Sequence, residues 1–582
     1  MNAVWPTLAC FAVYLWGYRV WGRRLSDRVF GLRDDEVTPA HTLRNDVDYL
    51  PTNRFVLFGH HFASITGLSP MLGPAIAVIW GWAPAMIWVV VGAVLVGCVH
   101  DFAALAVSIR ARGQSIGKVA EAVVGRRAKG LFLAIIFFGV SLAMGVFTIV
   151  IASLFAGSQG SAVIPSGGLM VVAAVMGWLA FRRGVALMPL TVVGFAIQLG
   201  LVWVGHRYPV GWADPAGWKW LLLAYAAAAS VLPVWSLLQP RDFLNSLLLY
   251  LGIGMCFVGF FVEAPRFAAP AFDPSPAGAP NFYPFVFITI ACGAASGFHS
   301  LVSSGTTAKQ LDRARDARLV GYGGMIGESL LGLLAVLATT AGVVISPAAA
   351  AQGKSAEGVW RDHYATWHAA SGLGPKMERF IEGAAGFVGA LGFDPGLAAA
   401  LIGVIVISFA LTTLDSATRL LRYNVEEIGA SLRVGALQNR FVATGLAVAS
   451  IGFFAFNDAA AGLWKVFGTV NQLLAGLALL VATLYLVRRG RNPWVTGIPT
   501  GFMLLTALVA TLGNLESFSH GWTFAPRELR PGEATPMPWL LFVVAVAVGV
   551  LGVWLTVEAA LAFRRFRREA RAPEALEVRF ED

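Results

Sequence analysis

Four histidines of this chain, His60, His61, His100 and His299, lie in or beside strongly apolar stretches. Ionisable side chains are rare at membrane depth, so each is a candidate for transport or proton relay. His299 and Ser303 are about one helical turn apart, which predicts that both face one site and that His299 titrates during transport. The alternative is a neutral histidine bonded to a backbone carbonyl or, for His60 and His61, a position at the membrane surface.

Three carboxylates are the acidic groups expected within reach of the bilayer. Asp101 precedes Arg110 near the expected inner face, where it would relay protons or anchor a cytoplasmic gate. Glu328 follows the string GYGGMIG, and close helix packing over these glycines should bury it. Asp415 precedes Arg419 by one helical turn, so a local ion pair and a proton-relay role are both open.

A charged pair of neighbours lies in the string QPRDFLNS. Arg241 and Asp242 are expected there in a tight cytoplasmic loop, where they would act as gate residues. Asp242 is also placed to cap a helix that begins near Phe243.

Helix breakers and small polar residues occur in two apolar stretches, His60–Trp82 and Ile288–Lys309. An unpaired backbone N–H or C=O in hydrocarbon costs several kcal/mol, so Gly67, Ser69 and Pro70 require protein, ion or substrate to pair the freed groups. Exposed N–H groups at the start of a half-helix would receive a carboxylate. These residues predict a discontinuous helix beside a substrate site, although a kink in a packed helix is the alternative.

The second stretch ends in side-chain hydroxyls, which belong to Ser303, Ser304, Thr306 and Thr307. Together with carbonyl oxygens freed at a helix break, they would suit a coupling cation such as sodium. The histidines and Asp101 could instead hold a transition metal. The absence of a compact ligand motif such as H-E-x-x-H speaks against a metal site, which stays open as the less favoured alternative.

The whole chain has the composition of a helical membrane protein. Of its 582 residues 57% are hydrophobic and 13% are charged, and its mean hydropathy is +0.69. That leaves too little polar surface for a soluble protein. The net charge of +10 comes from Lys and Arg in short loops, where they orient the chain and meet anionic lipid, so nucleic acid is not an expected partner. The four cysteines lie in apolar stretches without metal-ligand spacing and are expected to be packing residues.

Windows of about 20 residues predict about fifteen membrane-spanning helices in an all-α fold. Alternate loops are basic and are expected in the cytoplasm, which places the N-terminus outside and the C-terminus inside. The predicted spans lie near residues 2–22, 60–81, 84–109, 130–156, 168–181, 185–205, 217–238, 243–262, 283–305, 319–345, 383–411, 440–456, 460–487, 495–514 and 538–563.

This topology predicts a leucine-transporter-type core of two inverted repeats with five spans each. The first half is 59–205 and begins with the break at Gly67. The second half is 217–411 and is expected to begin with a discontinuous helix at Pro233, so that both breaks frame the substrate. The remaining segments are an N-terminal helix with a cytoplasmic segment (1–58), a cytoplasmic helical extension (412–439) and additional C-terminal helices with a charged tail (440–582).

Several strings resemble the signature blocks of the carbon starvation protein A family. They are NDVDYLPTNRFVLFGHHFASITGLSPMLGP, QPRDFLNS, ACGAASGFHSLVSSGTTAKQL, GYGGMIGES and ALTTLDSATRLLRY, and they run from about Asn45 to Tyr423. The resemblance implies a bacterial inner-membrane transporter of the amino acid–polyamine–organocation group that imports peptides or pyruvate, with proton coupling in the pyruvate importers. His100 stands where the family pattern has glutamine before Asp101, and the C-terminal part is more compact than in longer members.

The leading hypothesis is a proton-coupled importer that works by alternating access and binds a small substrate with a carboxylate. It would be no enzyme and would need no cofactor beyond the coupling ion. A sodium-coupled carrier is the nearest alternative, and a membrane-embedded metal or haem protein with histidine ligands is the alternative from another class. The sequence leaves pyruvate and peptides both open, and it sets no oligomeric state.

Overall fold

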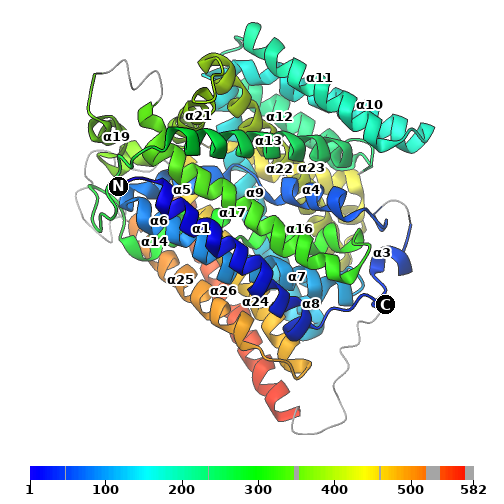
Figure 1. Cartoon of the computed structure of the whole chain (residues 1–582). Coiled ribbons are helices and arrows are strands. Elements are labelled where there is room, and N and C mark those ends of the chain that lie inside the picture. The colour runs from blue at the N-terminus through cyan, green and yellow to red at the C-terminus, as the bar shows by residue number, and fades with distance from the viewer. Residues whose placement is uncertain (46–47, 234, 346–352, 458–459, 520–537, 570–582) are drawn as a thin grey trace.

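The fold is almost entirely helical. The computed structural model describes residues 1–45, 48–233, 235–345, 353–457, 460–519 and 538–569, and these residues form no strand (Figure 1). Ten of the described helices are long and apolar enough to cross a membrane, and a bent pair, Arg54–Ile65 with Ser69–Trp80, makes an eleventh candidate. The prediction of an all-α membrane protein is confirmed, whereas the count of about fifteen spans stays a prediction.

Several helices continue into one another through short π-helical segments, such as Trp88–Gly97 between α6 and α7. The α-helices are α1 (Val4–Trp16), α2 (Gly22–Arg24), α3 (Pro39–Thr42), α4 (Arg54–Ile65), α5 (Ser69–Ala77), α6 (Trp82–Ile87), α7 (Cys98–Arg110), α8 (Ile116–Val123), α9 (Arg126–Ala156), α10 (Val163–Arg183), α11 (Leu187–Arg207), α12 (Pro215–Val231), α13 (Leu238–Glu263), α14 (Phe282–Thr289), α15 (Ala291–Ala294), α16 (Gly297–Gly305), α17 (Gly324–Leu337), α19 (Ala356–Tyr364), α20 (Trp367–Ala370), α21 (Leu373–Gly389), α22 (Pro395–Leu432), α23 (Arg440–Ala455), α24 (Ala460–Arg488), α25 (Trp494–Ser519) and α26 (Pro538–Glu569).

The first predicted break is present between α4 and α5, whose axes differ by 49°. Thr66 leaves the helical conformation, and α5 starts again at Ser69 with Pro70 in its first turn. Proline suits that position because its missing N–H would have no helical partner there. The expectation of a discontinuous helix at Gly67 to Pro70 is confirmed.

The second break lies in the stretch 288–309 and not at Pro233, so that part of the expectation is wrong. Residues 282–305 form three pieces, α14, α15 and α16, and Ala295 and Ser296 have extended backbones between the last two. Pro233 instead lies exposed in the loop between α12 and α13. The residue before a proline avoids the helical conformation, so α12 ends at Val231 and Leu232 has an extended backbone.

The two broken helices touch through their backbones. A Cβ added at Gly73 of α5 would lie 2.4 Å from the carbonyl oxygen of Thr289, and one added at Gly293 would lie 3.6 Å from the Cα of Pro70. Glycine is therefore required at position 73 for this approach. The contact brings both sets of freed main-chain groups into one region.

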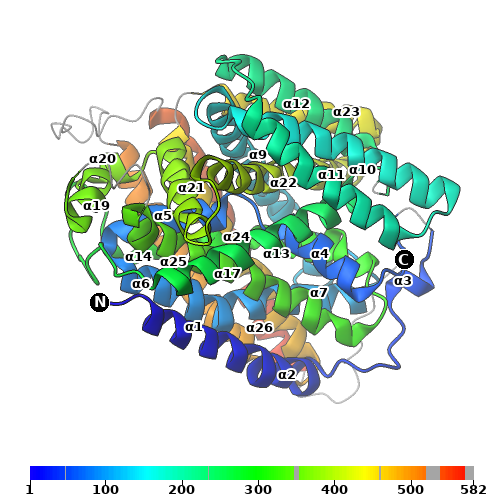
Figure 2. The ribbon, with the colours of Figure 1, turned by 45° about the horizontal axis from the view of Figure 1, so that its top comes forward.

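The contacts among the helices around the two breaks indicate how these helices are grouped. α9, α12, α22 and α23 pack against one another, while α13 packs on α4 and α24 packs on α16. Starting each repeat at a broken helix would give a first repeat from α4 to α13 and a second from α14 to α24, whereas the division into halves at 59–205 and 217–411 stays a prediction. The hairpin α10–α11 is then an insertion in the first repeat, and it lies at the edge of the molecule opposite α25 and α26 (Figures 1 and 2).

Residues 412–439 were expected to form a cytoplasmic extension or surface helix, but most of them continue α22, which ends at Leu432. Its buried residues include Asp415, Arg419 and Arg422. The predicted span 383–411 is likewise divided, because α21 ends at Gly389 and Asp394 caps a new helix by accepting from the N–H of Leu397.

Candidate functional site

A small cavity of about 20 Å³ lies at the two breaks. This volume accommodates about one water molecule, so the side chains around the cavity are closed together in this conformation. The lining comes from both broken helices and from α9, α22 and α24, and consists of Ile65, Gly67, Ser69, Gly139, Val140, Ala143, Met144, Phe147, Cys292, Phe298, Thr413, Phe467, Asn471 and Leu474.

Main-chain groups freed at the first break border this cavity. The N–H groups of Gly67 and Leu68 donate to no backbone carbonyl among the described residues. The carbonyl of Thr66 accepts from the hydroxyl of Thr413 on α22 at 3.3 Å. A Cβ added at Gly67 would lie 2.7 Å from Phe147 and 2.8 Å from the Thr413 hydroxyl, so glycine allows α9 and α22 to approach the break.

The start of α16, at the second break, is already occupied by a protein side chain. The amide oxygen of Asn471 accepts from the N–H of Phe298 and from the hydroxyl of Ser296, both at 3.1 Å. Its Nδ2 donates to the sulfur of Cys292 at 3.1 Å. Of the two half-helix starts, the one at α5 is therefore the one open to a ligand carboxylate.

A buried group of titratable side chains, the His299 cluster, lies next to the cavity and consists of His299, Asp101, Glu328 and His100. His299 Nδ1 lies 2.8 Å from Asp101 Oδ2, and its Nε2 lies 3.0 Å from Glu328 Oε2. His100 Nδ1 lies 2.8 Å from the other oxygen of Asp101. Cys292, in the cavity wall, is close enough to Glu328 and His299 to interact with them electrostatically.

The distances within the His299 cluster favour a bound proton. A neutral imidazole has one donor and one acceptor nitrogen, yet both nitrogens of His299 face carboxyl oxygens. Either His299 is an imidazolium between two carboxylates, or one carboxyl group is protonated. Loss of this proton would leave two buried anions facing one neutral ring, which is costly in a water-free interior.

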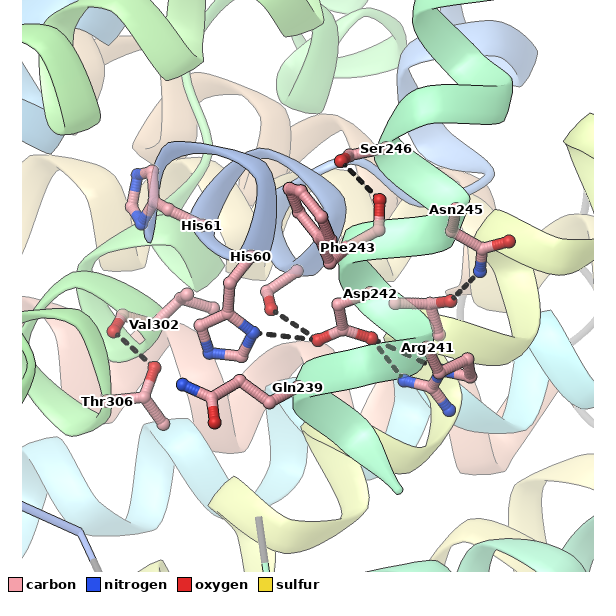
Figure 3. Close-up of polar contacts among 12 residues, drawn as sticks. His60, His61, Gln239, Arg241, Asp242, Phe243, Asn245, Ser246, Val302 and Thr306 are labelled. Carbon is pink, nitrogen blue, oxygen red and sulfur yellow. Dashed lines mark hydrogen bonds and ion pairs between the residues drawn. The ribbon is translucent and has the colours of Figure 1, made fainter. Parts of the chain in front are cut away.

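The second buried group, the Arg241 cluster, consists of Arg241, Asp242, Asp415, Tyr225 and His60. Figure 3 labels three of its members, His60, Arg241 and Asp242. The Arg241 guanidinium donates to Asp242 Oδ1 at 2.6 Å and to Asp415 Oδ1 at 3.0 Å. The Tyr225 hydroxyl donates to Asp415, and His60 Nδ1 lies 2.8 Å from Asp242 Oδ2. The cluster thus connects α4, α12, α13 and α22 through buried charges.

This cluster corrects three expectations. Arg241 and Asp242 lie inside α13, which begins at Leu238, so Asp242 is no helix cap. Asp415 pairs with Arg241 and not with Arg419, whose guanidinium donates to the carbonyls of Ala229 and Leu232. The physical reason is burial, because a charge without solvent takes the partner from any packed helix and not only from its own.

The predicted hydroxyls are mostly engaged within the protein. Ser304 donates to the carbonyl of Ser300, and Thr306 donates to that of Val302. The Thr307 hydroxyl lies 2.8 Å from His61 Nδ1. Ser303 is buried, and its hydroxyl has no partner among the described residues.

The structure separates the histidines that a metal or haem would need together. His60 faces Asp242 and the adjacent His61 faces Thr307, while His100 and His299 share Asp101. Within the described ranges, no group of three or more His, Cys, Asp or Glu could hold a metal ion.

Sequence reasoning missed Asn471, Thr413 and the central position of Arg241. Asn471 is followed by another buried amide, Gln472, within the long apolar helix α24. Polar side chains in such a segment usually face the bundle interior. That signal could have marked the position as part of the site.

A wider cavity of about 660 Å³ lies near the ends of α9 and α13 and the start of α22. Its charged lining is Glu263, Glu378, Glu382 and Arg379, and Glu378 accepts from Ser158 at 2.7 Å. It lies beside α21, and its charged side chains stand among apolar ones such as Ile345, Ile381 and Ala385.

Comparison with known proteins places this architecture in a family. The family model described as carbon starvation protein CstA matches residues 2–510. The peptide transporter CstA of Mycobacterium tuberculosis is 35% identical, with 88% of this chain and 75% of that protein covered. The peptide transporter CstA of Escherichia coli is 31% identical, with 88% and 81% covered, and its pyruvate/proton symporter BtsT is 29% identical, with 87% and 80% covered.

Among solved structures, a manganese transporter of Eremococcus coleocola is similar at a TM-score of 0.43 and 12% identity, with 90% of this chain and 99% of that one covered. MhsT in complex with L-phenylalanine is similar at a TM-score of 0.42 and 14% identity, with 88% and 99% covered. The family match extends over the broken helices, both buried clusters and most of the C-terminal helices. The chain therefore belongs to the carbon starvation protein CstA family.

Proposed function

We propose that this chain is a secondary transporter of the bacterial inner membrane that imports a small carboxylate-bearing nutrient, a peptide or pyruvate, together with protons. The observation that carries the proposal is a buried imidazole between two carboxyl groups, beside a cavity enclosed by two broken helices. Relatives named peptide transporter and pyruvate/proton symporter support both the substrate class and the coupling ion.

The substrate carboxylate would bind at the start of α5. The N–H groups of Gly67 and Leu68 are free to donate there, and the positive end of the helix dipole favours an anion. The corresponding position on α16 is capped by Asn471. The rest of the substrate would lie against Phe147, Met144 and Phe467 after these side chains have moved apart.

The coupling proton would be carried by the His299 cluster. Its members come from α7, α16 and the helix α17, so a change in proton occupancy alters the attraction among three helices around the cavity. This is the differential interaction that alternating access requires, because a ligand shifts a conformational equilibrium only by binding the two states unequally.

Proton coupling is favoured over sodium coupling, because most of the oxygen atoms that could bind a sodium ion are already bonded within the protein. The hydroxyls of Ser304 and Thr306 donate to carbonyls of their own helix. The carboxylates of Asp242 and Asp415 already hold a fixed cation, the Arg241 guanidinium. A sodium ion would have to displace these partners.

The experiment is uptake by the purified chain in proteoliposomes under an inward pH gradient, with labelled pyruvate in one series and a labelled dipeptide in another. We expect uptake of one or both substrates with acidification of the lumen. Glu328→Gln should remove the gradient dependence while substrate exchange continues, since the amide keeps the shape but cannot release a proton. Glu357→Gln, at an exposed carboxylate, is the control.

Absence of uptake of both substrates, with a control carrier active in the same vesicles, would contradict the proposal. Replacing sodium by choline in the same assay distinguishes the sodium carrier, which would lose activity.

A further inference from the structure

A polar cavity of about 410 Å³ lies apart from the substrate cavity, at the end of the bundle that carries the basic segment Arg488 to Arg491. It is formed by the chain segment that follows the N-terminal helix, by the end of α7 and by the end of α24. Its lining consists of Val29, Phe30, Gly31, Arg33, Asp35, Glu36, Arg110, Tyr485, Leu486, Arg489 and Arg491.

The charges of this cavity are unbalanced. Arg33 pairs with Asp35, and Arg110 pairs with Glu36 at 2.7 Å while donating to the carbonyl of Phe30. No carboxylate in the described part of the chain forms an ion pair with Arg489 or Arg491. Two guanidinium groups therefore have no carboxylate partner among the described residues, and that of Arg489 lies over the ring of Tyr485, 5.4 Å from its centroid.

A buried donor faces the same space. The Tyr485 ring is almost fully buried, at 1% exposure, and its hydroxyl lies near Arg110 without a hydrogen-bond partner of ordinary geometry among the described residues. Buried hydroxyls are normally paired, so an unpaired one that lines a polar cavity indicates a missing acceptor. Gly31, at φ of 61°, turns the chain so that it passes beside the Arg491 guanidinium.

We propose that this cavity binds a phosphate-type oxyanion through Arg489, Arg491 and the hydroxyl of Tyr485. Guanidinium forks match the geometry of phosphate oxygens, and the volume is that of a small-ligand site. The anion is either the headgroup of an acidic phospholipid or free inorganic phosphate, since both present the same oxygens. The proposal is independent of the transported substrate.

Because of where this cavity lies, a bound anion would affect the relative motion of two helices. α7 belongs to the first repeat and carries Asp101, while α24 belongs to the second and carries Asn471. A ligand held between the ends of these helices restrains their relative motion. Occupancy would therefore change the transport rate.

The test uses the full chain, purified in detergent and stripped of lipid. Inorganic phosphate is titrated against chloride at constant ionic strength with thermal unfolding as the readout, and retention of phosphatidylglycerol against phosphatidylcholine is measured by native mass spectrometry. Tyr485→Phe removes the buried hydroxyl at unchanged charge, and Arg489→Gln/Arg491→Gln removes both cations. Arg182→Gln/Arg183→Gln removes two cations from another basic loop and is the matched control.

We expect apparent affinity to fall about tenfold for each lost charge-assisted hydrogen bond, in both cavity variants and not in the control. Stabilisation by phosphate identifies the free anion, and selective retention of phosphatidylglycerol identifies the lipid headgroup. Equal behaviour of wild type, Tyr485→Phe, Arg489→Gln/Arg491→Gln and the control in both measurements overturns the proposal.

Discussion

At the scale of single residues, buried charges define what this chain can do. Part of this was predictable, because ionisable residues in apolar sequence were expected to be functional, and His299, Asp101 and Glu328 meet as one group. Their partners were not predictable, since the nearest charge in sequence is seldom the nearest in a packed bundle. Asp415 illustrates this, because its pairing with Arg241 depends on how α13 and α22 cross.

Removing one charge of the Arg241 cluster should be strongly destabilising. Asp415→Asn leaves the buried guanidinium undercompensated, and breaking a buried pair in this way costs about 3 kcal/mol. We expect a clearly lower midpoint of thermal unfolding in detergent.

Asp362→Asn is the matched control, because Asp362 forms an exposed pair with Lys354 that should contribute about 1 kcal/mol or less. Equal stability of the two variants would show that the buried cluster does not hold the helices together.

Lys376 should make stability depend on pH. It lies in the first turn of α21, outside the candidate membrane spans, and donates to the carbonyl of His363 at 2.7 Å. Burial, followed by the nearby Arg379, lowers the pKa of Lys376 from 10.5 to about 7. Between these values the unfolded chain binds more protons than the folded one, so stability rises with pH above about 7, by at most about 1.4 kcal/mol per unit.

Lys376→Met should remove this rise in a series of unfolding midpoints from neutral to alkaline pH, whereas Lys354→Met, at an exposed lysine, should retain it. A rise that persists in Lys376→Met would assign it to another group.

At the scale of elements, the positions of most helices followed from apolar run length, whereas their grouping did not. The stretch 288–309 was recognised by its breakers, yet the second discontinuity was assigned to Pro233 because repeats were counted as consecutive spans. The hairpin α10–α11 explains the error. An inserted pair of spans leaves the orientation of later helices unchanged, so counting and charge bias cannot detect it.

The contact between the broken helices should tolerate no side chain at position 73. Gly73→Ala places a methyl group 2.4 Å from the Thr289 carbonyl oxygen, and overpacking of this kind costs about 1–3 kcal/mol. We expect lower thermal stability and slower uptake in proteoliposomes.

Gly501→Ala is the control, since no atom lies within 4 Å of the added Cβ and helix propensity should make the change neutral or stabilising. Full activity of Gly73→Ala would mean that the broken helices do not work in contact.

At the scale of the whole molecule, side-chain exposure separates core from periphery. α9 and α22 are largely buried, whereas α11 and α26 expose large apolar residues such as Val192, Trp203, Val550 and Trp554. Exposed apolar side chains on long apolar helices are expected to face lipid. The transport machinery thus occupies the centre, and the added helices form its contact with the bilayer.

The basic loops predict how the molecule is oriented. Glu357→Cys on intact cells should react with a membrane-impermeant maleimide, whereas Arg183→Cys should react after permeabilisation, because its basic loop is expected in the cytoplasm. Background labelling should be low, since Cys10, Cys98, Cys256 and Cys292 are all buried. The reverse pattern would invert the assigned topology.

The adjacent histidines of α4 have a consequence for how the carrier moves. Neighbouring residues on a helix point about 100° apart, and here one ring is bonded to α13 and the other to the segment after α16. If α4 swings outward to admit water from the cytoplasm, both bonds must break in the same event. Release of the substrate toward that side would then expose both imidazoles to solvent together.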